Sequence, residues 1–210
     1  MKTKLILLLV SVFHIALTKA QETAMSSAEI TSFKQAVVAE AQKIKTLKTD
    51  FVQYKHLDFL SKEITSSGSM LLKNPNKLLW KYNTPIQYGI LFKDNKVLVN
   101  DQGKKNKVDL GNNKKFEKIN KMIIGSISGD LFAADDFTIT FHKNRNQRIA
   151  KLSPKTKELS AYIQTIVLYF NDQQSTVSEV QLIEPSKDYT KIVFKNKQIN
   201  QPISDALFSF

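Results

Sequence analysis

The chain has 210 residues, the length of one large domain or two small ones, and it contains no cysteine. The missing cysteine excludes disulfide scaffolds, thiolate zinc sites, iron–sulfur clusters, cysteine nucleophiles and a lipid-bearing cysteine of the chain's own. Hydrophobic residues make up 42%, enough for a folded core, and 31 basic against 19 acidic residues give a net charge of +12.

The first twenty residues have the pattern of a secretory signal peptide. Lys2 and Lys4 precede an apolar run over residues 5–17, and Thr18 and Ala20 are the small residues of a cleavage site. The run is short for a membrane span, which needs about 20 residues. We therefore expect residues 1–20 to be removed and residues 21–210 to form a single exported domain.

The positive charge of the mature chain is almost entirely lysine. Removal of the leader leaves 28 basic and 19 acidic residues, a net charge of +9, and only Arg145 and Arg148 are arginines. Proteins that read nucleic acids usually depend on arginine, so we expect no nucleic-acid partner. The charge fits an anionic surface, such as lipid head groups or an acidic protein, and it equally fits a role in solubility alone.

Residues 26–47 have the pattern of an amphipathic helix. Ser26 and Glu29 have the spacing of a capping box. Apolar residues then recur every three or four positions and form one stripe: Ile30, Phe33, Val37, Ala41, Ile44 and Leu47.

From residue 49 onward the apolar period is mostly two, which indicates strands. We expect strands at 51–57, 63–73, 77–84, 88–93, 96–100, 107–110, 137–141, 147–152, 162–170, 177–183 and 189–195, with a second helix at 113–127. The fold class is mainly β with some α: one antiparallel sheet of about ten or eleven strands, which must curl to bury its apolar side.

No motif of the chain indicates catalysis or metal binding. His56 and His142, the two histidines of the mature chain, lie far apart in sequence and lack metal-ligand spacing. Gly125 to Gly129 resembles a nucleophile elbow only superficially, because it follows a helix and has isoleucine at the centre. The acidic residues at 130–136 lack the alternation of a calcium loop. We expect no enzyme, no cofactor and no metal.

Several strands are apolar on both faces. Residues 70–72, 78–80 and 166–170 run without alternation. One explanation is a thick core with a cover layer on each face. The other is a concave face that is apolar because an apolar ligand binds there. The composition alone does not separate the two.

A series of short motifs resembles the LolA family of periplasmic lipoprotein carriers. They are Phe-Val-Gln at 51–53, Gly-Ser-Met-Leu-Leu-Lys-Asn-Pro-Asn at 68–76, Leu-Leu-Trp-Lys-Tyr at 78–82, Pro85 and the Asp-Asn turn at 94–95. Residues 208–210 resemble the closing strand of the family. The resemblance implies an unclosed antiparallel β-barrel with helices that cover its concave apolar face.

The resemblance also implies a function without catalysis. Such a carrier takes acyl chains of lipoproteins from an inner-membrane ABC transporter, crosses the periplasm as a monomer and delivers them to an outer-membrane acceptor. The side chains expected to contact the acyl chain are Ile64, Met70, Leu72, Leu78, Trp80, Tyr82, Phe92, Phe33 and Ile123. For Trp80 an ordinary core position remains the alternative.

The chain departs from the family pattern at Asn74, where members often carry an arginine linked to closing the lid and releasing cargo. This departure fits a carrier for another cargo, such as a pigment lipid or a glycolipid. A sensor or adaptor built on the same fold is a further alternative. A cluster of seven lysines within residues 104–121 indicates either a docking surface or a solvated face. The candidate docking residues are Lys104, Lys105, Lys114, Lys115 and Lys118.

Overall fold

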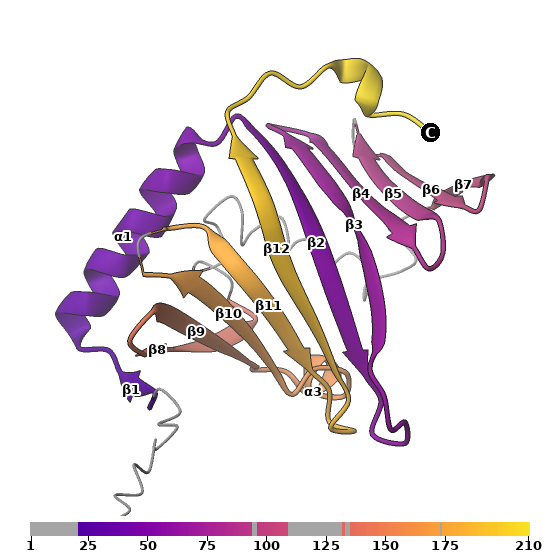
Figure 1. The fold of residues 1–210 in the computed structure, drawn as a ribbon. Helices are drawn as coiled ribbons and strands as arrows, with labels where there is room; N and C mark the ends of the chain where they lie inside the picture. Colours follow the sequence, from indigo (N-terminus) through magenta and orange to yellow (C-terminus); the bar gives the residue numbers. More distant parts are fainter. Residues whose placement is uncertain (1–20, 94–95, 109–131, 133–134, 173) are drawn as a thin grey trace, which may run out of the picture.

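The structure, a computed structural model, describes residues 21–93, 96–108, 132, 135–172 and 174–210. All twelve described strands form one antiparallel sheet in the order β1-β8-β9-β10-β11-β12-β2-β3-β4-β5-β6-β7 (Figure 1). The sheet curls without closing, which confirms the expected fold class with a slightly larger number of strands. The signal peptide expected at 1–20 and the helix expected at 113–127 lie outside the described residues.

The chain builds one half of the sheet and then the other. A short strand and the long helix come first: β1 (Thr23–Ala24) and α1 (Ser27–Lys43). The next strands are β2 (Thr46–His56), β3 (Ile64–Lys73), β4 (Lys77–Thr84), β5 (Tyr88–Lys93), β6 (Lys96–Asp101) and β7 (Lys104–Val108). The second half contains β8 (Phe137–Lys143), β9 (Gln147–Pro154), α3 (Lys157–Ser160), β10 (Thr165–Asn171), β11 (Val177–Ile183), β12 (Tyr189–Ile199) and the 3₁₀ turn η3 (Asp205–Leu207). Because β12 pairs with β2, it joins the two halves.

Helix α1 ends earlier than its apolar stripe predicts. Ser26 caps its start as expected, but Ile44 is the C-cap and Leu47 lies in β2, opposite Leu72 of β3. The cause is a distant residue: the Asn200 side chain accepts a hydrogen bond from the Lys45 backbone N–H at 2.7 Å and holds the chain extended there. Although the helix has ended, Ile44 and Leu47 are both buried in one apolar cluster with residues of β3 and β4.

The second apolar face of the sheet is covered by the C-terminal segment. Leu71, Leu79 and Leu91 point away from α1 and pack against Ile203 and Phe208. Lys73 and Lys77 clamp this segment through Asp205, at 2.7 and 3.0 Å. The expectation of a closing strand at 208–210 is wrong, because these residues follow the turn η3 and are not part of the sheet (Figure 1). Phe208 packs on the face of the sheet opposite α1, here called the outer face.

We expect Phe208→Ala to lower the free energy of unfolding by about 3–5 kcal/mol, because its ring is only 1% exposed and its loss leaves a cavity. Leu207→Ala is the matched control. Its side chain is 54% exposed, so a change within about 0.5 kcal/mol is expected. Urea unfolding of both variants measures the difference. Equal losses would contradict the role of the C-terminal segment as a structural cover.

Gly68 allows β3 to approach β4 beneath an aromatic ring. A Cβ at this position would lie 2.0 Å from the Lys81 carbonyl oxygen and 2.7 Å from the ring of Phe51, its partner on β2. The carbonyl belongs to the backbone of a central strand and cannot move away cheaply. A glycine is therefore required here by close approach.

We expect Gly68→Ala to destabilise the fold by at least about 2 kcal/mol through overpacking. Gly89→Ala provides the comparison, since its Cβ would meet only the Phe210 ring, at 2.5 Å, near the end of the chain. That ring can rotate away, so the loss should be smaller. Thermal and urea unfolding of the two variants measure the ranking, and a larger loss for Gly89→Ala would overturn the explanation.

Candidate functional site

Two apolar clusters lie on the face of the sheet that α1 covers, here called the inner face. Phe33 and Val37 of α1 belong to the first, with Phe141 and Phe170 of the second half of the sheet. Ile44 belongs to the other, with residues of β2, β3 and β4. Phe194 of β12 packs against both. The inner face is therefore apolar from one half of the sheet to the other.

The structure brings most of the expected acyl-contacting residues together. Those of β3 to β5 form one cluster, in which Met70, Leu72, Leu78 and Trp80 are buried and Tyr82 and Phe92 are partly buried. Their pairing follows the register, with Met70 opposite Trp80 and Leu72 opposite Leu78. Phe33 lies in the other cluster and Ile64 is 45% exposed at the start of β3. Ile123 lies outside the described residues.

Trp80 is the centre of an aromatic group. The ring centroids of Phe51 and Phe194 lie 4.5 and 6.1 Å from its own. Next to it, the Tyr82 hydroxyl donates to Gln53 Oε1 at 2.8 Å, and burial raises the pKa of Tyr82. Phe194 was not anticipated as a site residue, although its alternation with Ile192 on one strand is a signal that could have identified it.

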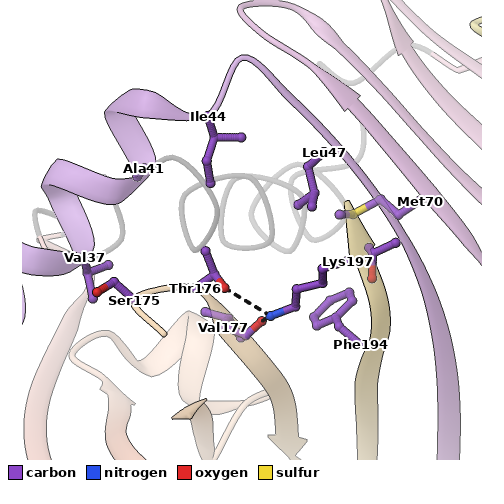
Figure 2. Close-up of a pocket in the computed structure, with 11 residues that line it drawn as sticks. Val37, Ala41, Ile44, Leu47, Met70, Ser175, Thr176, Val177, Phe194 and Lys197 are labelled. Atoms are coloured by element: carbon purple, nitrogen blue, oxygen red, sulfur yellow. Dashed lines mark hydrogen bonds between the residues drawn. The ribbon is translucent and has the colours of Figure 1, made fainter. Parts of the chain in front are cut away.

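A narrow cleft separates α1 from the inner face (Figure 2). Apolar side chains dominate its lining. Val37 and Ala41 of α1 and its C-cap Ile44 lie on one side, and the residues opposite are Leu47, Thr49, Met70, Ser175, Thr176, Val177, Phe194 and Lys197. The cavity volume is about 20 Å³, room for one water molecule. In this structure the helix is therefore closed on the sheet, and a larger guest requires the helix or the lining to move.

Lys197 is the charged residue of this lining, and sequence reasoning missed it. Its ammonium group donates to Thr176 Oγ1 at 3.2 Å and to the Val177 carbonyl oxygen at 2.5 Å (Figure 2). Burial disfavours the charged form and lowers the pKa of Lys197 to about 8. The cleft is therefore lined mainly by apolar side chains, and Lys197 provides its one positive charge among the described lining residues.

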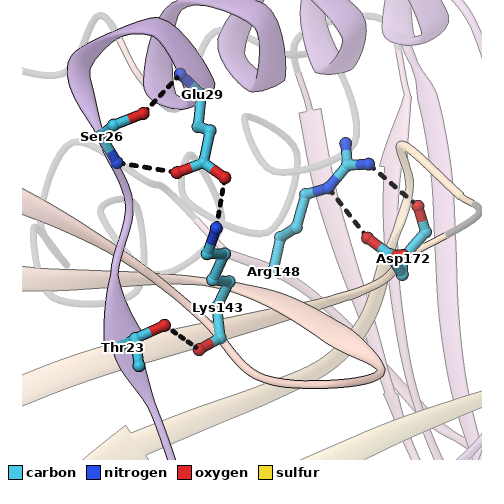
Figure 3. A network of polar contacts seen from close by, with 6 residues as sticks. All are labelled: Thr23, Ser26, Glu29, Lys143, Arg148 and Asp172. Atoms are coloured by element: carbon cyan, nitrogen blue, oxygen red, sulfur yellow. Dashed lines mark hydrogen bonds and ion pairs between the residues drawn. The ribbon is translucent and has the colours of Figure 1, made fainter.

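The N-terminal end of α1 is fixed to strand β8 (Figure 3). Ser26 and Glu29 form the expected capping box, and Glu29 also pairs with Lys143 of β8. The hydrogen bond from Lys143 is the main cause that lowers the pKa of Glu29 from 4.5 to about 2. Beside this pair, Arg148 donates to Asp172 at 3.2 Å and lies over the Phe33 ring.

The C-terminal end of α1 is held by Asn74, in the turn between β3 and β4. Its side-chain amide donates to the Ile44 carbonyl oxygen at 2.6 Å, and its backbone N–H donates to Lys45 at 2.9 Å. Asn200 adds a bond to the Lys43 carbonyl oxygen at 3.0 Å. A neutral amide therefore attaches the turn between β3 and β4 to the end of the helix.

Two of the candidate docking lysines can be placed. Lys104 and Lys105 lie exposed on the edge strand β7, where Lys105 donates to the Phe210 carbonyl oxygen at 2.6 Å. Lys114, Lys115 and Lys118 lie outside the described residues. Within the part of the chain that is described, no three acidic or histidine side chains gather to hold a metal ion. No helix in that part has the length and apolar character that crossing a membrane requires.

We expect Glu29→Gln to weaken the attachment of α1 and flatten the acid dependence of stability. Glu29 has a lower pKa folded than unfolded, so its contribution is complete above pH 4.5 and is lost as the pH falls towards 2. Asp205, whose pKa Lys73 also lowers to about 2, contributes in the same range and is present in both proteins. Unfolding curves between pH 2 and 7 measure the slope. Glu40→Gln, which removes an exposed pair with Lys43 on the same helix, is the control and should retain the wild-type slope.

Comparisons with known proteins agree with this architecture. A family model described as outer membrane lipoprotein carrier protein LolA matches residues 42–210. No curated protein sequence matches the chain. The complex of MucA and MucB from Pseudomonas aeruginosa is similar with a TM-score of 0.51 and 7% identity, over 86% of this chain and 61% of that one. A DUF1329 family protein from Desulfovibrio piger has a TM-score of 0.47 and 12% identity, over 86% and 97%. At 7% identity the likeness to the MucA and MucB structure concerns the fold alone.

Proposed function

Because the chain belongs to the LolA family, we propose that it is a non-catalytic periplasmic carrier that binds acyl chains of lipoproteins between α1 and the inner face. It would receive them from an inner-membrane ABC transporter and deliver them to an outer-membrane acceptor. The observation that carries the proposal is the apolar cleft beneath a helix whose two ends are attached by polar contacts.

The closed cleft explains how such a carrier could both capture and release. Transfer of a sixteen-carbon acyl chain from water is worth roughly 12 kcal/mol, at about 0.8 kcal/mol for each methylene. A cavity of about 20 Å³ cannot hold that chain, so cargo must displace the apolar stripe of α1 from the inner face. The free energy of helix packing is then subtracted from that of binding. This competition weakens the complex enough for transfer to an acceptor.

A carrier for a different lipid, such as a pigment lipid or a glycolipid, is the second candidate. Asn74 supports it, because a neutral amide holds the end of α1 where an arginine is usual in the family. A short amide that bonds to Ile44 cannot act through charge. The release step would then differ from that of a carrier gated by arginine.

We expect a fatty acid with bromine in its chain, 9,10-dibromostearate, to quench the fluorescence of Trp80, the single tryptophan. Unbrominated stearate should not quench. The control is the double variant Trp80→Phe with Phe59→Trp, which moves the tryptophan to a loop position that is 80% exposed. Quenching should be strong for Trp80 and weak for the control. Equal quenching of both, or none, would contradict binding at the inner face.

Native mass spectrometry of protein purified without detergent from a periplasm provides the test of cargo. Lipid or lipoprotein adducts are expected, and depletion in the native host should leave lipoproteins at the inner membrane. Normal lipoprotein sorting with loss of another exported lipid would favour the second candidate. Absence of any adduct, together with absence of quenching, would overturn the carrier proposal.

A further inference from the structure

A β-bulge in β12 turns Lys197 into the cleft. The pairing of β12 with β2 passes from Lys195 opposite Asp50 to Gln198 opposite Lys48, so β12 contains one extra residue. At the bulge Asn196 has a φ of 53°, in the left-handed region, and its side chain donates to Asp50 at 2.9 Å. A one-residue shift moves every following side chain to the other face of a strand.

Without the bulge, residue 197 would share the outer face with Lys195, which is exposed. With it, the aliphatic part of Lys197 passes along Phe194 and its ammonium group reaches towards the start of β11 (Figure 2). Thr49, a buried polar residue, stabilises the bulge by donating to the Lys195 carbonyl oxygen at 2.7 Å. The bulge in β12 and its hydrogen bond to Thr49 therefore determine that Lys197 points to the inner face.

The contacts of Lys197 leave its charge without a partner of opposite sign among the described residues. An ammonium group has three donors, and the described acceptors are two neutral oxygens, those of Thr176 and Val177. The other lining residues, from α1, β2, β3 and the start of β11, include no titratable side chain. Placing a cation in such surroundings is unfavourable unless an anion joins it.

We propose that Lys197 is the counter-ion for an acidic head group, so that the cleft takes amphiphiles whose acyl chain ends in a carboxylate or phosphate. The inference rests on the proposed carrier function and, of its two candidate cargoes, favours the second, a lipid other than a lipoprotein. Acyl chains joined to a protein through ester or amide bonds carry no charge at the linkage. A cationic point beside the apolar inner face therefore favours free fatty acids or acidic lipids over such chains.

Competition with the neutral fluorescent probe N-phenyl-1-naphthylamine tests the head group at constant chain length. The ligands are dodecanoate, dodecyl phosphate and dodecan-1-ol, with acetate and inorganic phosphate as anions without a chain. We expect the two acidic amphiphiles to bind wild-type protein at least about tenfold more tightly than the alcohol, a difference of 1.4 kcal/mol. The short anions should not displace the probe, and displacement by them at the same concentrations would overturn the assignment to a lipid.

Lys197→Met, which retains most of the aliphatic side chain, should bind acid and alcohol equally. Lys195→Met, two residues away on the exposed side, should retain the tenfold preference. Raising the pH through the pKa of Lys197, about 8 in the free protein and higher with an anion bound, should abolish the preference in wild type and leave alcohol binding unchanged. Thermal unfolding checks that both variants are folded.

The outcomes separate this inference from the function on which it rests. If acid and alcohol bind wild-type protein equally, or if Lys197→Met retains the preference, the head-group assignment is wrong while the carrier proposal stands. If no amphiphile displaces the probe, both fail. The wild-type comparison and its pH dependence remain decisive even if a variant does not fold.

Discussion

The structure depends on one constraint: the central strands are apolar on both faces, and each face needs its own cover. On the outer face the C-terminal segment provides it, with Phe208 fully buried and Asp205 held by two lysines. On the inner face the cover is α1, whose apolar side chains leave only a narrow cleft between the helix and the sheet. The apolar excess is therefore accounted for by a cover layer on each face, and the proposed ligand would bind beneath one of these covers, α1.

The two covers differ in a way that fits the proposed function. The outer segment inserts a large aromatic ring among leucines, and its removal would expose a cavity. Helix α1 contributes smaller side chains at its C-terminal half, and its ends are attached by hydrogen bonds and an exposed ion pair that solvent can replace. Phe33 anchors the N-terminal half of α1 in the first cluster, so the proposed guest would enter beneath the C-terminal half, where Val37 and Ala41 line the cleft.

Local signals predicted well what local contacts determine. The capping box of Ser26 and Glu29 lies within four residues and located the start of α1, and the two-residue repeat of a strand placed Met70, Leu72, Leu78 and Trp80 on one face. The end of α1 was misplaced because Asn200, 155 residues away, determines it. Lys197 was missed because a single extra residue reverses the alternation that would place it outside. The strand expected at 208–210 rested on the resemblance alone, and it was wrong because these residues follow the turn η3 and Phe208 packs on the outer face.

The pairing of β12 with β2 has a consequence for how the protein is made. These strands meet in the middle of the sheet, yet Thr49 and the Lys195 carbonyl oxygen that it contacts are 146 residues apart in sequence. The two halves of the sheet can therefore join only when the last strand is present, and pairing over such a separation is slow. A chain that must cross a membrane unfolded, as the proposed export requires, gains from this arrangement. With such export, the complete sheet would form only after β12 has crossed the membrane.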